Sequence, residues 1–132
     1  MARLRQAGAK ALTTARSSTV FTADEMFVTA DLSSAEGCAV VAEAVQKRLG
    51  SVDIIVHVVG GSSAPAGGFA ALDDDEWRRA LDLNLFPAVR LDRALLPGKP
   101  EQGSGVIIHV TSIQRQTSRP ASMSSRTSGS GI

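Results

Sequence analysis

The sequence contains no tyrosine and only one cysteine, Cys38. Without a phenol, every acid–base mechanism that depends on tyrosine is excluded for this chain. A single thiol can form neither an internal disulfide nor a cysteine metal cluster. No apolar run approaches the roughly 18 residues that a membrane helix needs, and the first residues lack the apolar stretch of a secretion signal. We therefore expect no membrane span and a cytoplasmic location.

The chain also has no large excess of charge of either sign. The 132 residues include 14 basic and 13 acidic side chains, a formal net charge of +1. So small an excess does not indicate nucleic acid or anionic lipid as a partner, and small molecules or proteins are the better candidates. The length and the 43% hydrophobic content suit one globular domain.

Short, β-branched apolar runs alternate with helical patterns, as in βαβ units, so the sequence predicts an α/β fold with a parallel sheet. The runs mostly do not alternate between apolar and polar residues, which is typical of strands covered on both faces. The predicted strands are 10–14, 26–29, 52–59 and 105–111.

Two helices have clear signals. The first opens with Ser33 and with Glu36 three residues later, a capping box, and ends before Gly50, which can adopt a left-handed conformation. The second is expected to begin at Asp73, and Pro87 should force a kink or a new helix start.

From residue 113 onward the chain is rich in Ser, Thr, Gly and Arg and shows no periodicity. We expect residues 1–112 to form the domain and residues 113–132 to be a disordered tail, since this composition cannot bury enough apolar surface to become ordered. The alternative is a segment for RNA binding or phosphorylation.

Residues 1–112 resemble the middle of a short-chain dehydrogenase/reductase, a Rossmann-type family of NAD(P)-dependent oxidoreductases. The resemblance rests on the order and spacing of several short motifs. These are Ala15-Arg16-Ser17, Ala30-Asp31-Leu32-Ser33, Asp53 to Gly60, Asp82-Leu83-Asn84-Leu85, and Val106 to Ser112.

The resemblance implies a cofactor site. Arg16 follows the family's second strand, where a basic residue favours NADP(H) over NAD; the alternative is an ordinary exposed arginine. Asp31 and Leu32 match the pair that contacts the adenine, unless Asp31 only begins a turn. Gly60 matches the glycine that lets the backbone pass close to the cofactor, or else it is a turn glycine.

The resemblance also implies catalytic residues for a small carbonyl or alcohol substrate. Asn84 matches the asparagine that holds a water of the proton relay, and Ser112 matches the serine that hydrogen-bonds the substrate carbonyl. Alternatively, Asn84 bonds a free carbonyl beside Pro87 and Ser112 merely ends a strand. His57 and His109 are expected to be satisfied core residues, and no metal site is expected.

Two parts of the family pattern are missing. The family's proton donor is a tyrosine followed four residues later by a lysine, and its spacing places the tyrosine near Ser125 or Arg126. This chain has no tyrosine, and its last lysine is Lys99. It also shows no Gly-x-Gly-x-x-Gly turn for the pyrophosphate, since residues 1–8 resemble the end of a helix. We therefore expect a truncated, inactive chain whose NADP(H) binding is in doubt.

The expected strand order 3-2-1-4-5-6 makes the missing first strand the central one. Its absence would expose two edges of buried strands, so we expect self-association in preference to direct pairing across the gap. Two other interpretations stay open. The chain is either a non-catalytic interaction module, or the product of a frameshifted or misassigned gene.

Overall fold

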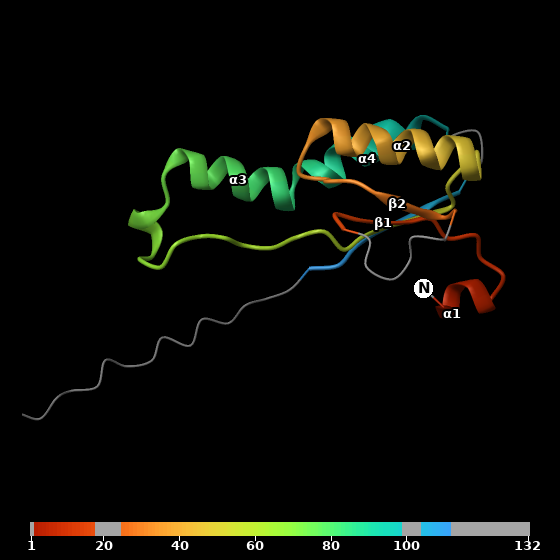
Figure 1. Ribbon diagram of the computed structural model, residues 1–132, viewed down its shortest axis with the longest axis horizontal. Coiled ribbons are helices and arrows are strands. Elements are labelled where there is room, and N and C mark those ends of the chain that lie inside the picture. The colour runs from red at the N-terminus through yellow and green to blue at the C-terminus, as the bar shows by residue number, and fades with distance from the viewer. Residues whose placement is uncertain (1, 18–24, 99–103, 112–132) are drawn as a thin grey trace, which may run out of the picture.

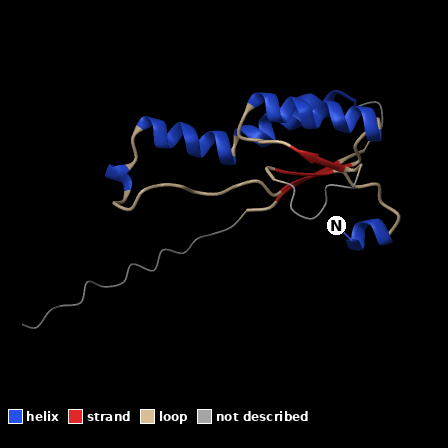
Figure 2. Ribbon diagram, viewed as in Figure 1, coloured by secondary structure: helices blue, strands red, loops and turns tan. Residues whose placement is uncertain are grey.

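A computed structural model describes residues 2–17, 25–98 and 104–111 of the protein (Figure 1). Ser112 and the tail 113–132 lie outside the described residues, so the predictions made for them stay predictions. The described residues contain both helices and strands (Figure 2). The elements are α1 (Ala2–Gln6), β1 (Thr13–Ala15), β2 (Phe27–Thr29), α2 (Ala35–Leu49), β3 (Ile54–His57), α3 (Asp74–Asn84), α4 (Phe86–Leu95) and β4 (Val106–His109), with 3-10 turns at Phe69–Ala71 and Leu96–Gly98.

The strands form two separate parallel pairs. β1 pairs with β2 and β3 pairs with β4, and within the described residues no ladder joins β1 to β3. These are the pairs expected from the order 3-2-1-4-5 when its central strand is not present. The predicted α/β class and partial parallel sheet are thereby confirmed. β1 begins three residues later than predicted, because its pairing register starts at Thr13 opposite Phe27.

Helix α2 is capped at both ends, but its N-cap differs from the prediction. Ser34, not Ser33, is the N-cap, and its hydroxyl oxygen accepts a hydrogen bond from the Gly37 N–H at 2.9 Å. Ser33 instead bonds to Asp31, so it is not available to the helix. At the other end, Gly50 adopts a φ of 76° and donates to carbonyls of the last turn, as predicted.

The break between α3 and α4 follows the sequence closely. Asp73 caps α3, its carboxylate accepting from the Glu76 N–H at 2.8 Å. Helix α4 then starts at Phe86, with Pro87 in its first turn, where a missing N–H costs nothing. Figure 1 shows α3 extending away from the strands, whereas α2 and α4 lie side by side above them.

The core lies between the helix pair α2–α4 and one face of the strands. It consists of buried side chains from both layers: Val28, Ala30, Leu32, Cys38, Val41, Val45 and Leu91. The other face of β3 and β4 is exposed within the described residues. It presents Ile54, Val56, Val106 and Ile108. The prediction that both faces are covered is therefore wrong for the described part, where the helices that pack on these strands all lie on one side.

No helix in the described ranges combines the length and the apolar character needed to cross a membrane.

Candidate functional site

Polar residues gather where the strands end. Figure 1 shows the strands running in one direction, so their carboxyl ends share one edge of the molecule. Arg16 follows β1, Asp31 follows β2 and Gly60 follows β3, each within three residues of the strand end. In open α/β sheets ligands bind in the crevice outside these carboxyl ends. The structure thus places three of the four predicted cofactor residues at the edge where a ligand is expected.

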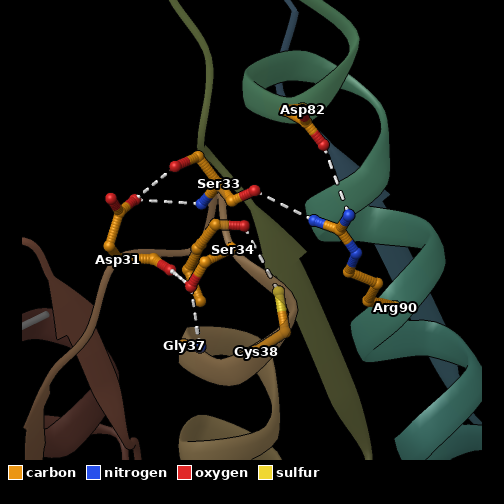
Figure 3. Close-up of polar contacts among 8 residues, drawn as sticks. Asp31, Ser33, Ser34, Gly37, Cys38, Asp82 and Arg90 are labelled. Atoms are coloured by element: carbon orange, nitrogen blue, oxygen red, sulfur yellow. Dashed lines mark hydrogen bonds and ion pairs between the residues drawn. The ribbon is translucent and has the colours of Figure 1, made fainter. Parts of the chain in front are cut away.

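Asp31 organises the turn between β2 and α2 (Figure 3). One carboxylate oxygen accepts hydrogen bonds from the Ser33 hydroxyl at 2.8 Å and from the Ser33 N–H at 3.0 Å. The Asp31 carbonyl also accepts from the hydroxyl of Ser34 at 3.0 Å. These contacts are those of a turn-forming aspartate. The carboxylate remains exposed, however, so the turn leaves it accessible to a ligand.

The electrostatics of this turn favour a charged carboxylate. The hydrogen bonds from the Ser33 hydroxyl and N–H hold the pKa of Asp31 below its ordinary value. Desolvation opposes this in part, and the positive charge of Arg16 makes the smallest contribution, which also lowers the pKa. Arg16 is exposed and acts on Asp31 across the ends of the paired strands β1 and β2. Arg16 and Asp31 therefore place a positive and a negative charge at the same edge of the strands.

Leu32 has a different position from its neighbour. Its side chain is only 6% exposed and belongs to the core cluster. Any contact of Leu32 with a base must therefore come from its main chain. Its carbonyl is already engaged, because the Cys38 thiol donates to it at 3.3 Å. Burial raises the pKa of that thiol, which favours its neutral form.

Arg90 is an organising residue that the sequence analysis missed. From α4 its guanidinium donates to the Ser33 carbonyl at 3.0 Å and to the Asp82 carboxylate at 3.3 Å (Figure 3). It also lies 5.1 Å from the centre of the Phe86 ring, a cation–π contact. Arg90 therefore ties the turn after β2 to α3 and α4. No local pattern reveals this, because 57 residues separate Arg90 from Ser33.

Asn84 holds the loop that leaves β3. Its side-chain amide donates to the Gly61 carbonyl at 2.9 Å and to the Ala80 carbonyl at 2.8 Å, while its oxygen accepts from the Gly61 N–H at 3.0 Å. A Cβ on Gly60 would lie 3.0 Å from that oxygen, a tight contact that would require the Asn84 side chain to shift by a few tenths of an ångström. The carbonyl that Asn84 bonds in the helix is that of Ala80, one turn back.

Next to this loop lies a pocket of about 190 Å³. The loop residues Gly61 and Ser62 form one wall, and Trp77 and Leu83 of α3 lie among the residues of the other. Of the predicted site residues, none lines it. The pocket and the Arg16–Asp31 edge are therefore separate features.

The two histidines differ in environment. His57 is 9% exposed and forms an ion-pair contact with Asp92 at 2.8 Å, which confirms that it is a satisfied, buried residue. His109 stacks on the His57 ring with a centroid distance of 4.8 Å, yet it is exposed. The prediction of a core position is wrong for His109, because the described helices leave the end of β4 open.

The model of the short chain dehydrogenase family matches residues 1–128, and the chain belongs to this family of oxidoreductases. Dehydrogenase/reductase SDR family member 7B of Danio rerio is 32% identical over 93 residues, which are 70% of this chain and 29% of that protein. The chain spans between about a quarter and a third of the length of its curated relatives.

Solved structures agree on a Rossmann-like fold. A metagenomic short-chain oxidoreductase in complex with NADP is 26% identical, with a TM-score of 0.73 over 84% of this chain and 54% of that one. L-sorbose reductase from Gluconobacter frateurii, complexed with NADPH and L-sorbose, is 35% identical, with a TM-score of 0.56 over 63% of this chain and 31% of that one.

Proposed function

We propose that the chain is part of an oxidoreductase that interconverts a small carbonyl compound and an alcohol with NADP(H), and that it supplies the adenosine end of the cofactor site. The observation that carries this proposal is that the exposed Arg16 and Asp31 follow the carboxyl ends of β1 and β2, two strands paired in parallel. A cytoplasmic location stays part of the same proposal.

The described residues fit that end of a dinucleotide. The exposed Arg16 guanidinium suits the ribose 2′-phosphate that distinguishes NADP from NAD. Asp31 keeps one carboxylate oxygen outside its bonds to Ser33, which leaves an acceptor for an adenine amino group. Structures in the comparison contain NADP, NADPH or NAD, so the preference for a phosphorylated cofactor rests on Arg16.

The remaining predicted residues would act nearer the reacting carbonyl. Asn84 keeps the loop after β3 against α3, so that the Gly60 backbone passes the cofactor at a constant position. Ser112 would donate a hydrogen bond to the substrate oxygen. The cofactor supplies the hydride when it is bound. We also propose that this chain alone does not turn over, because it has no tyrosine to exchange the proton.

Ligand titration followed by NMR chemical shifts tests the proposal on the full chain. We expect 2′,5′-ADP to bind more tightly than 5′-AMP, with the largest shifts at residues 16 and 31. Arg16→Ala should remove the difference between the two nucleotides, because it removes the partner of the 2′-phosphate. Arg93→Ala, which removes an exposed arginine of α4, is the matched control and should leave the difference unchanged.

Equal binding of the two nucleotides to the unmodified chain would contradict the assignment of Arg16. Oxidation of NADPH by the chain with a panel of ketones and aldehydes would contradict the proposal that it does not turn over.

A further inference from the structure

Two histidines and an aspartate meet where β3 and β4 end. We propose that His57, His109 and Asp92 form a binding site for a divalent transition metal ion of the zinc class. The three donor atoms lie within 4.8 Å of one another. The proposal follows from how the sheet register and helix α4 bring these side chains together.

The strand register pairs the two histidines. His57 and His109 are directly opposite each other in the parallel β3–β4 ladder, so both side chains leave the same face of the pair. Their rings are stacked, with centroids 4.8 Å apart and planes inclined by 17°. Two imidazoles are thus presented side by side on a rigid backbone.

The third donor comes from the helix above that face. Asp92 of α4 places a carboxylate oxygen 2.8 Å from Nε2 of His57. Asp92 is 20% exposed and His57 is 9% exposed, whereas His109 is open to solvent. An ion can therefore enter from the side of His109 and still be shielded on the side of His57.

The distances between the three donor atoms suit a small ion after modest side-chain rotation. Metal–ligand bonds of about 2.0–2.1 Å put tetrahedral donors about 3.3 Å apart. The His57–Asp92 contact would open by about 0.5 Å, and the widest separation would close by about 1.5 Å. Such changes need only torsions of His109 and Asp92, because the backbone positions are already set by the ladder and by α4.

The donor set determines the class of ion. Two imidazoles and one carboxylate match the ligands preferred by zinc, copper, nickel and iron, and not those of Mg²⁺ or Ca²⁺, which take oxygen ligands. Three protein ligands leave a fourth position for water. Bound metal would join β3, β4 and α4, and so lock the end of this strand pair to the helix.

Cobalt and zinc binding to the full chain, purified without a histidine tag and stripped with a chelator, tests the site. Calorimetry should show one Zn²⁺ per chain, and Co²⁺ should develop the visible bands of a tetrahedral site. His109→Gln and Asp92→Asn should each weaken binding by at least about 100-fold, because even groups that only orient a ligand account for about 10–100-fold. Asp75→Asn, an exposed aspartate of α3, is the matched control and should bind as the unmodified chain does.

His109→Gln is the decisive variant, since an exposed ring can be replaced without disturbing the core, and its far-UV circular dichroism should equal that of the unmodified chain. The absence of stoichiometric Zn²⁺ binding would overturn the proposal. A Zn²⁺ affinity that His109→Gln and Asp92→Asn leave unchanged would also overturn it. The His57–Asp92 pair would then serve only to tie β3 to α4.

Discussion

Gly37, in the first turn of α2, is the position where one methyl group should do most damage. A Cβ there would lie 1.9 Å from the carbonyl oxygen of Asp31 and 2.6 Å from its carbon. Non-bonded carbon atoms pack at about 3.5–4.0 Å, so the backbone has to move by more than about 1 Å. The atoms in the way belong to the main chain, so no side-chain rotation relieves the clash.

The magnitude of Gly37→Ala follows from three effects. Overpacking of this kind costs about 1–3 kcal/mol. Displacing the turn also weakens the cap that Ser34 makes to the Gly37 N–H, which contributes about 1 kcal/mol. Alanine returns about 0.5–1 kcal/mol through its helix propensity. The sum is a loss of about 2 kcal/mol in the free energy of unfolding, or about 7 °C in Tm for a domain of this size.

Thermal and urea unfolding at one fixed protein concentration measure this effect. Gln46→Ala, at an exposed position of the same helix, is the control and should change the free energy of unfolding by less than about 0.5 kcal/mol. Helix propensity alone predicts the opposite sign for Gly37→Ala. A Tm equal to or above that of the unmodified chain would refute the steric argument.

Three further outcomes are expected. The pKa of Asp31 is lowered in the folded chain, so the stability it provides is complete above the unfolded pKa of about 3.9 and is lost as the pH falls through the lower folded pKa. Asp31→Asn should remove this acid-side dependence from urea unfolding curves, and an unchanged pH profile would count against it. In the unmodified chain, Gly60→Ala should lower the free energy of unfolding by about 0.5–1 kcal/mol more than it does in the Asn84→Ala background, because the shortened side chain of that variant no longer meets the new methyl group. Equal losses in this double-mutant cycle would disprove the contact. Within the described residues no strand pairs the edges between the two strand pairs, and we expect these edges to make the purified chain associate, as measured by size-exclusion chromatography with light scattering. A concentration-independent monomer with cooperative melting would contradict this.

The sequence alone determined the elements whose signals are local. Asp73 marks the start of α3 because it caps that helix, and Pro87 marks the start of α4 because it has no N–H to donate. The structure confirms both. The α/β class follows from the alternation of apolar runs and helical patterns, and the ordered motifs reveal the family. These signals depend on residues a few positions apart, so no knowledge of distant neighbours is needed.

Only the tertiary structure decided which distant side chains meet. The capping-box pattern predicted Ser33 as the cap of α2, but the carboxylate of Asp31 takes the hydroxyl of Ser33, and Ser34 caps the helix instead. The tie from Arg90 to Ser33 joins residues far apart in the chain, and the His57–Asp92 pair joins a strand to a helix. Such contacts depend on the strand register and on where α4 packs, and neither quantity is encoded within a few neighbouring residues.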